Sequence, residues 1–281
     1  MQIITSINEL RATLSASESP IGLVPTMGFL HDGHLALMQE ARKHNKTVVA
    51  SIFVNPTQFG PNEDFDKYPR DIARDEALLT QAGVDILFYP SVQEMYPAGA
   101  ATTIHVTGVS EGFCGASRPV HFDGVALVVT KLFNIVSPQN AYFGLKDYQQ
   151  FQVIRRFVKD LNIDVKLTGV PIVREADGLA LSSRNVYLSA DERRSALSLS
   201  ASFELITRLL AEKKPLDEIK KAAIDFIHSH PHTAVEYLDF ADPDSLQLVH
   251  SGEAHFVCLM AVRVGKTRLI DNKLFSEVSY I

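Results

Sequence analysis

Cysteine is scarce in this chain of 281 residues, which contains only Cys114 and Cys258. The two lie far apart and share no CxxC spacing, so a disulfide framework is not expected, and we interpret both as small buried hydrophobic residues. No apolar run approaches the roughly 20 residues that a membrane-spanning helix requires. The amino-terminal sequence MQIITSINEL also lacks the apolar core of a signal peptide. These absences predict a cytoplasmic protein that does not associate with membranes.

Positive charge is also limited, because 27 Lys and Arg residues face 33 Asp and Glu residues, a formal net charge of −6. Without a basic stretch, a dedicated nucleic-acid binder is not expected, and an enzyme acting on tRNA is disfavoured. Binding of ATP remains compatible with this balance, because a few local donors suffice for one phosphate tail. The sequence also contains no GxSxG elbow and no convincing Cys–His pair, so we expect no protein nucleophile.

Residues 1–175 alternate between strand-like and helix-like segments. Such alternation predicts an α/β fold, here a Rossmann-like, doubly wound parallel sheet with helices on both faces and right-handed crossovers. We expect residues 1–175 to form a domain that binds a nucleotide and a small substrate at the carboxyl ends of its strands. The expected strands are 21–27, 47–54, 85–89, 141–143 and 165–173, and the expected helices are 35–43, 71–82, 122–136 and 147–161.

Residues 176–281 show a different pattern, with two helical segments followed by strands. The helices are expected at 190–212 and 216–230, and the strands at 235–240, 255–264 and 267–270, with Gly265 in a tight turn between the last two. This order predicts a smaller carboxy-terminal α+β domain. We place the boundary near Glu175 and expect this domain to cover the active-site cleft.

The segment PTMGFLHDGH, residues 25–34, follows an expected strand and precedes an expected helix. The amino terminus of a helix at the carboxyl end of a strand suits phosphate, and glycine allows close backbone approach. Because His31 and His34 are three residues apart, one helical turn can aim both rings at one place. A solvated or capping histidine pair is the alternative. A metal pair is disfavoured, since Asp32 is the only further ligand nearby and should point elsewhere.

Two further polar segments follow expected strands. The string FVNPTQFG places Asn55 and Gln58 in a loop where neutral amides can orient a hydroxy acid or an amine, although Asn55 also suits an ordinary Asn-Pro turn. The string FGLKDYQQ, residues 143–150, offers Lys146 to a phosphate, or else to solvent. Asp147 can cap the next helix, accept from a ribose hydroxyl or help to hold magnesium. Of Gln149 and Gln150, only one should point into the cleft.

The segment VREADGLALSSRN, residues 173–185, joins the two parts of the chain. Its hydroxyls Ser182 and Ser183 and the guanidinium of Arg184 suit a triphosphate. A loop beside a hinge can also close over a nucleotide and exclude water. The alternative is an ordinary loop leading to a helix whose amino terminus is capped by Ser189.

The order of these motifs resembles a known family. HDGH after PTMG is similar to the HIGH-type signature of nucleotidylyltransferases and class I synthetases, and the string PTMGFLHDGHLALM resembles the pantothenate synthetase (pantoate–β-alanine ligase) family. GLALSSRN is close to a motif of that family, and LIDNK at 269–273 is a fainter echo. The family usually has glutamate where this chain has Leu145, so only a backbone contact would survive there. A glycine is common where Val120 stands.

The resemblance implies ATP-dependent condensation of (R)-pantoate with β-alanine through a pantoyl-adenylate, releasing AMP and pyrophosphate. Mg²⁺ would be held by the ATP phosphates with no confident protein ligand, and the enzyme would be a homodimer with ATP, pantoate and β-alanine as partners. Gln58 would bind both pantoate and β-alanine, and Gln150 would bind pantoate. The catalytic donors would be His34, His31, Lys146, Ser182, Ser183 and Arg184. The ATP site would comprise Met27, Gly28, Phe29, Leu30, His31, Asp32, Gly33, His34, Gly144, Leu145, Lys146, Asp147, Val173, Leu181, Ser182, Ser183 and Arg184.

Two other functions stay open from the residues. A nucleotidyltransferase that stops after transferring a nucleotide would use the same HDGH segment, but it would need a cationic acceptor pocket where the NPTQ loop is neutral. A regulatory module that binds a nucleotide without turnover is disfavoured by the joint presence of His34, Lys146 and Arg184. The side chains of Arg118 and His121 could approach the cleft or another subunit, and neither receives a catalytic role.

Overall fold

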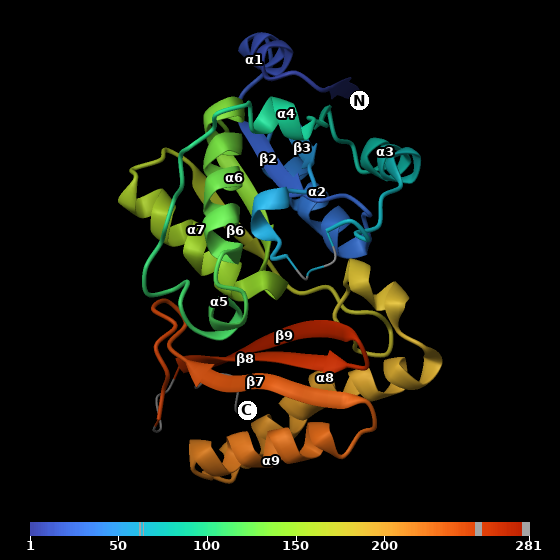
Figure 1. Cartoon of the computed structure of the whole chain (residues 1–281), viewed down its shortest axis with the longest axis vertical. Coiled ribbons are helices and arrows are strands. Elements are labelled where there is room, and N and C mark those ends of the chain that lie inside the picture. Colours follow the sequence, from blue (N-terminus) through green and yellow to red (C-terminus); the bar gives the residue numbers. More distant parts are fainter. Residues whose placement is uncertain (62, 64, 251–254, 277–281) are drawn as a thin grey trace.

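The computed structural model describes residues 1–61, 63, 65–250 and 255–276. Two sheets organise the chain, a six-stranded parallel sheet and a three-stranded antiparallel sheet, and the first lies above the second in Figure 1. In the described part of the chain, no helix combines the length and the apolar character needed to cross a membrane.

The parallel sheet has the strand order β1-β4-β3-β2-β5-β6. All six residues of β3 are buried, as expected for a strand that has helices on both sides. The doubly wound sheet predicted from the sequence is therefore confirmed. The strands are β1 (Gln2–Ile4), β2 (Ile21–Thr26), β3 (Thr47–Ile52), β4 (Ile86–Phe88), β5 (Asn140–Gly144) and β6 (Lys166–Val170).

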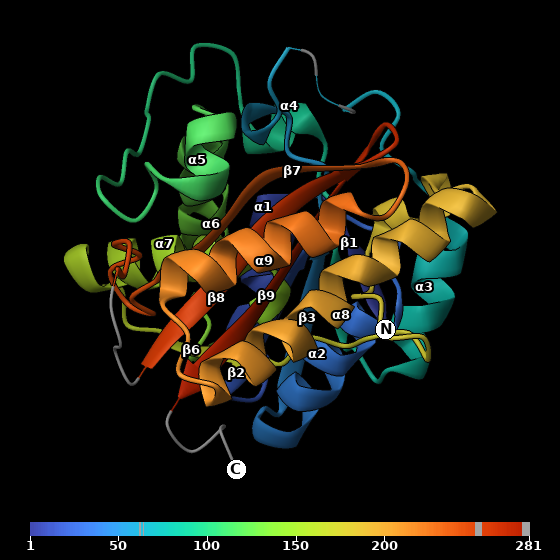
Figure 2. The same ribbon diagram turned by 90° about the horizontal axis from the view of Figure 1, so that it is seen from below.

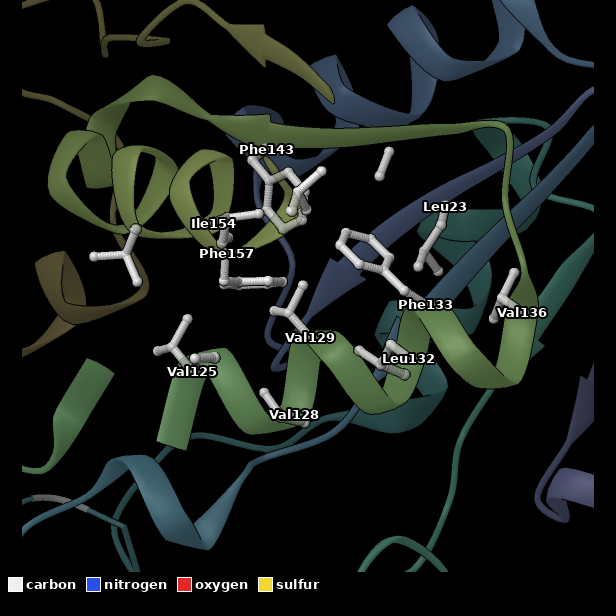
Figure 3. Packing of buried hydrophobic residues seen from close by; sticks show 14 of the residues in the cluster. Leu23, Val125, Val128, Val129, Leu132, Phe133, Val136, Phe143, Ile154 and Phe157 are labelled. Carbon is white, nitrogen blue, oxygen red and sulfur yellow. The ribbon is translucent and has the colours of Figure 1, made fainter. Parts of the chain in front are cut away.

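Helices cover both faces of this sheet. On one face, α2 (Asp32–His44) and α3 (Ile72–Gln81) share a core with the strands. On the other face lie α1 (Ile7–Ser15), α6 (His121–Val136) and α7 (Tyr148–Asp160). Figure 3 shows Val129 and Phe133 of α6 pointing toward Phe143 and Phe157. Because α6 is apolar around most of its circumference, it is buried against both the sheet and its neighbouring helices.

The antiparallel sheet consists of β7 (Thr233–Ala241), β8 (His255–Val264) and β9 (Thr267–Ser276). Helices α8 (Ala190–Ala211) and α9 (Leu216–His228) cover its outer face, as the view from below shows (Figure 2). Strand alternation divides the residues of β8: Phe256, Cys258 and Met260 pack toward these helices, whereas Val257 and Leu259 join the core of the parallel-sheet part. Gly265 makes the turn to β9 with φ of +58°.

The sequence did not predict several short elements. These are β1, α1, α4 (Val92–Met95) and α5 (Phe113–Ser117), and the 3₁₀ turns η1 (Pro56–Gln58), η2 (Leu145–Asp147) and η3 (Ser183–Tyr187). The expected strand 165–173 ends early, at Val170, because Pro171 has no N–H to donate to a sheet. β9 extends beyond the expected 270. The division at residue 175 stays a prediction.

The strand order locates the crevice of the sheet. β2 pairs with β5, and the chain runs from β2 outward through β3 and β4 but from β5 outward through β6 on the other side. In open parallel sheets, ligands bind outside the carboxyl ends of the strands at such a reversal. The segments after β2 and β5 are those that contain His31 and Lys146.

Candidate active site

A cavity of about 220 Å³ lies at this reversal. Its wall is formed by the segments that follow β2, β3 and β5, by α6, and by residues 171–184. The structure therefore brings together side chains that are more than 100 positions apart in the sequence. The polar side chains on the wall include His31, His34, Gln58, Lys146, Asp147, Gln150, Ser182, Ser183 and Arg184.

The turn after β2 is held from behind by Asp75 of α3. Its carboxylate accepts hydrogen bonds from the backbone N–H groups of Phe29 and Leu30 at 2.7 and 2.8 Å. Gly28 and Phe29 have positive φ values of +82° and +50°. The side chain of Asp75 is almost wholly buried, and that burial raises the pKa of its carboxyl group. Asp75 thus stabilises a left-handed turn that the backbone would otherwise disfavour.

Of the residues from 27 to 34 that were expected at the nucleotide site, only some line the cavity after this turn. Met27, Gly33 and both histidines line the cavity. Gly28 and Phe29 instead line a neighbouring groove beside α3, Leu30 is fully buried, and Asp32 is exposed in the first turn of α2. The structure does not bring these four to the cavity wall: the left-handed turn directs Gly28 and Phe29 toward α3, Leu30 points into the core, and Asp32 faces solvent.

His31 and His34 lie side by side, with ring centroids 4.1 Å apart. The backbone N–H of His31 donates to Nδ1 of His34 at 3.3 Å, so the proton of a neutral His34 ring resides on Nε2. Burial and the neighbouring His31 lower the pKa of His34 well below 6.5. His34 is therefore a neutral donor at physiological pH, at the amino terminus of α2.

His31 is also neutral, and its two ring nitrogens differ in their surroundings. Burial, followed by the nearby charge of Lys146, lowers the pKa of His31 to about 4. Its Nδ1 is buried without a hydrogen bond from the described residues. Gly33 makes this ring position possible, since a Cβ atom there would lie 2.9 Å from Cε1 and Nδ1 of His31. The pair aimed at one place, as expected from the sequence, is present.

The orientation of the Gln58 amide is set by Asn55. Oδ1 of Asn55 accepts from the backbone N–H of Thr57 at 3.3 Å and from the hydroxyl of Tyr96 at 2.9 Å. Nδ2 of Asn55 must then face the other way, and it donates to the carbonyl of Gly124 and to Oε1 of Gln58, both at 3.1 Å. Gln58 consequently presents its NH₂ group, which also contacts Sδ of Met27 at 3.1 Å.

Arg118 and His121 hold the main chain of Gln58. Nδ1 of His121 donates to the carbonyl of Gln58 at 2.9 Å, and the guanidinium of Arg118 donates to the same oxygen at 3.3 Å. Glu63 binds that guanidinium through both carboxylate oxygens. Burial and the positive charge of Arg118 lower the pKa of His121 to about 4. These two residues, which received no role from the sequence, fix the amide on the cavity wall.

The turn after β5 brings Lys146 to the cavity. Gly144, Lys146, Asp147 and Gln150 line the wall. Gln149 points away and is buried, donating to the carbonyls of Val109 and Gly112, so one glutamine of the two faces the cavity, as expected. Asp147 occupies the N-cap position of α7 without a side-chain cap hydrogen bond, and its carboxylate lies 3.9 Å from Nζ of Lys146.

The leucine at position 145 points away from the cavity. A Cβ atom on Gly169 of β6 would lie 2.6 Å from Cδ2 of Leu145, so the two residues are in close contact. The side chain also packs against the core beside α7. The departure from the family pattern is therefore accommodated by packing, and residue 145 does not line the cavity.

Residues 173–184 return to the cavity as a narrow hairpin, with the backbone N–H of Leu181 donating to the carbonyl of Val173 at 3.0 Å. Both residues line the cavity. Ser183 donates to the carbonyl of Phe29 at 3.3 Å, which joins this segment to the turn after β2. Ser182 caps η3 by accepting from the N–H of Arg184 at 3.3 Å. Ser189 caps α8 in a capping box with Glu192, as the sequence suggested.

The cavity offers little to a metal ion by itself. Among the residues that the structure describes, no three His, Cys, Asp or Glu side chains form a group that could hold one. Asp147 contributes a half-exposed carboxylate to the wall. This donor set fits a divalent cation that arrives with a phosphate chain, because Mg²⁺ usually keeps waters and binds one or two carboxylates plus substrate phosphates.

Sequence reasoning missed two supporting residues. Asp75 lies 46 and 45 positions from the two backbone groups that it binds, and it stands in the first turn of an amphipathic helix, where an acidic residue is usually exposed to solvent. Tyr96, whose hydroxyl fixes Asn55, lies in a stretch without clear periodicity. No local signal in the sequence identifies either residue.

Comparison with known proteins identifies one family over nearly the whole chain. The family model described as Pantoate-beta-alanine ligase matches residues 2–274. The curated pantothenate synthetase of Acetivibrio thermocellus is 51% identical over 279 residues, covering 97% of this chain and 98% of that protein. The pantothenate synthetase of Moorella thermoacetica is also 51% identical, over 276 residues, with coverage of 97% and 98%.

Solved structures give the same result. The crystal structure of pantothenate synthetase from Thermus thermophilus has a TM-score of 0.93 and 48% identity, covering 97% of this chain and 99% of that one. A pantoate-beta-alanine ligase from Francisella tularensis, complexed with beta-gamma ATP and beta-alanine, has a TM-score of 0.82 and 34% identity, with coverage of 98% and 97%.

Proposed function

Because this chain belongs to the pantoate–β-alanine ligase family, it catalyses the ATP-dependent ligation of pantoate and β-alanine, and we propose that it does so in the cavity at the sheet reversal. The convergence of His34, Lys146, Arg184 and Gln58 on this one cavity carries the assignment of the site. The same wall offers donors suited to phosphate and a neutral amide suited to a hydroxy acid, as the joining of an acid to a nucleotide requires.

The reaction we propose has two half-reactions. A carboxylate oxygen of (R)-pantoate attacks the α-phosphorus of ATP, and the bond to the β-phosphate breaks to give pantoyl-adenylate and pyrophosphate. The amine of β-alanine then attacks the acyl carbon, loses a proton and displaces AMP. Each step exchanges one leaving group for one nucleophile, so no covalent bond to the protein is required. Catalysis then consists of positioning and charge stabilisation.

Neutral histidines suit the first half-reaction. His34 donates from Nε2 at all pH values where the enzyme is expected to work, because its pKa lies well below 6.5. His31 beside it is neutral as well, with a pKa of about 4. These rings stabilise charge that develops on the phosphates without releasing or taking a proton. Net positive charge for the triphosphate comes from Lys146 and Arg184, and Ser182 and Ser183 add hydroxyls.

The amides suit the other substrates. Gln58 presents an NH₂ group to the cavity, and Gln150 lines the same wall. We assign pantoate to both and β-alanine to Gln58, following the family resemblance. The backbone around Gly33 and Gly144, which line the cavity, supports the nucleotide, and Mg²⁺ would accompany the ATP phosphates beside Asp147.

A second cavity of about 980 Å³ adjoins the first and supports a route for the second substrate. It lies between the parallel-sheet part and strands β7–β9, and it shares Lys146, Gln150 and Arg184 with the first. We propose that residues 176–281 form the smaller domain covering this cleft. Shielding matters because an acyl-adenylate is lost to water if the site stays open. We further propose that the enzyme is a cytoplasmic homodimer.

An assay of AMP formation tests the function. The complete mixture of MgATP, pantoate and β-alanine should release AMP and pyrophosphate in equal amounts with the amide product, and omission of β-alanine should suppress AMP release but leave pantoate-dependent exchange of pyrophosphate into ATP. A nucleotidyltransferase that stops after nucleotide transfer would show the same product pattern with and without β-alanine. AMP release that does not depend on pantoate would contradict the proposal.

A further inference from the structure

The LIDNK segment at 269–273 has no part in the chemistry described so far. It lies in β9, the edge strand of the antiparallel sheet nearest to the parallel-sheet part in Figure 1. Its two central residues are polar and buried: the side chain of Asp271 is 2% exposed, and Asn272 as a residue is 7% exposed. Buried polar side chains need partners, and those of this pair lie on opposite sides of the strand.

Asn272 contacts the turn that contains Lys146. Its Nδ2 atom donates two hydrogen bonds of 2.9 Å, one to the carbonyl of Leu145 and one to the carbonyl of Lys146. Both protons of one NH₂ group are thus used on two consecutive carbonyls of η2. These two hydrogen bonds, called the Asn272 fork below, connect the antiparallel sheet to the turn that follows β5 of the parallel sheet. It determines how far the backbone of Lys146 stands from β9.

Asp271 contacts the other phosphate-binding segment through Arg174. The carboxylate accepts from both terminal nitrogens of Arg174 at 2.7 and 2.9 Å, and from the backbone N–H of Asn272 at 2.8 Å. Arg174 also donates to the carbonyl of Gly178 at 3.1 Å, closing the tip of the hairpin that leads to Ser182 and Arg184. Bidentate pairs of this kind fix geometry as well as charge.

We propose that Asn272 and Asp271 are positioning residues for the ATP site. Asn272 holds the main chain of Lys146, and Asp271 holds the hairpin of residues 173–184 through Arg174. Two consecutive residues of β9 therefore set the separation between the two phosphate-binding segments. The inference rests on the proposed function, since it concerns the same nucleotide site. It gives the carboxy-terminal sheet a role in ATP use beyond covering the cleft.

The first test is steady-state kinetics of Asn272→Ala, with each substrate varied in turn. Loss of the Asn272 fork lets the Lys146 turn shift, so kcat/KM for ATP should fall roughly 10-fold to 100-fold, with KM for ATP raised. KM for pantoate should rise less than KM for ATP, because Gln150 follows the Lys146 turn but the Asn55–Gln58 contacts do not involve β9. Lys273→Ala is the matched control: its Nζ faces Thr207 of α8, and its kinetics should match those of the wild type.

A double-mutant cycle with Lys146→Ala identifies the route of the effect. If Asn272 acts through Lys146, Asn272→Ala should cost little further activity in the Lys146→Ala enzyme. Full additivity, or an equal rise of KM for all three substrates, would overturn the proposal. Asn272→Ser retains one donor and should give an intermediate KM for ATP, and it replaces the alanine variant if that one does not fold. Failure of the proposed function would appear separately, as a wild-type enzyme without pantoate-dependent exchange.

Discussion

The ring of His34 is held in one tautomer by a backbone N–H, and this leaves one specific proton for the substrate. His34→Ala should therefore reduce pantoate-dependent pyrophosphate release by roughly 10²–10³, the effect of removing one preorganised donor. His34→Gln, whose Nε2 can reach a similar position, should retain more activity than the alanine variant. His44→Ala serves as the control, because that ring is exposed at the far end of the same helix. A near-normal rate in His34→Ala would refute the role.

The buried His121 makes a prediction about stability. Its pKa is about 4 in the folded protein against 6.5 for an ordinary histidine, so between these values the unfolded chain binds the proton and the folded chain does not. The contribution of His121 to the free energy of unfolding is thus fully present above pH 6.5 and is lost as the pH falls toward 4. In His121→Asn, which can keep the donor to Gln58, the loss of unfolding free energy between pH 7 and 4.5 should be smaller by roughly 2–3 kcal/mol.

Urea denaturation at a series of pH values measures this difference. His250→Asn is the control, since it is the same substitution at an exposed position. An identical slope for His121→Asn and the wild type would show that the burial of His121 does not depress its pKa.

At the scale of elements, α6 packs against the 3₁₀ turn η1 without room for a side chain at Gly124. A Cβ atom there would lie 2.4 Å from the carbonyl oxygen of Thr57 and 2.6 Å from the N of Gln58. Gly124→Ala should lower the free energy of unfolding by about 1–3 kcal/mol and displace Gln58, raising KM for pantoate more than KM for ATP. Thermal unfolding and kinetics measure the two effects.

Gly112→Ala is the matched control for this prediction. A Cβ atom at Gly112 would meet nothing within 4 Å, and its φ of −82° suits alanine. Equal kinetic changes in the two variants would mean that the packing of α6 against η1 does not govern the position of Gln58.

The sequence predicted elements well where the pattern was long and regular. The apolar residues of α6 and the β-branched run of β3 reveal burial directly, and both elements were found within two residues of their expected ends. Three-residue strands such as β1 and four-residue helices such as α4 carry too few residues for a period to show. The stretch around α5 is held by contacts from elsewhere, such as the Gln149 side chain at the N–H of Cys114.

Site residues could be predicted from the sequence where a segment with reactive side chains follows an expected strand. His31, Lys146 and Arg184 were expected at one place, and all three line the same cavity. The residues that hold the cavity-lining segments in place could not be predicted. Asp75, Tyr96 and Asn272 act on backbone or amide groups that are tens of residues or more away in the sequence. The position of Phe29 beside α3, away from the cavity wall, also could not be predicted, since a positive φ at a phenylalanine follows from the Asp75 contact and not from its own preference.

For the whole molecule, the shared core predicts cooperative unfolding. Leu259 of β8 is 5% exposed and packs in the same cluster as residues of α6 and α7. Leu259→Ala should lower the free energy of unfolding by about 2–5 kcal/mol and reduce amide protection in β5 and α7 as well as in β8. Hydrogen exchange followed by mass spectrometry gives the protection of each segment.

An independent second domain would behave differently. In that case Leu259→Ala would speed exchange only after residue 190, and the parallel sheet would keep its protection. Thr207→Val, at a partly buried position of α8 remote from the parallel sheet, provides the comparison for an effect confined to one part.

The tethered carboxamide of Gln58 has a consequence for inhibitor selectivity. Its oxygen already accepts a hydrogen bond from Asn55, which turns the NH₂ group toward the cavity, so a compound beside Gln58 meets a hydrogen-bond donor. An analogue with an ether or ketone oxygen opposite Gln58 should bind well. Its counterpart with an N–H at the same atom would set two donors against each other and should lose about 10-fold or more in affinity, because a buried donor is left unsatisfied. Medicinal chemistry against this pocket should accordingly build acceptors there.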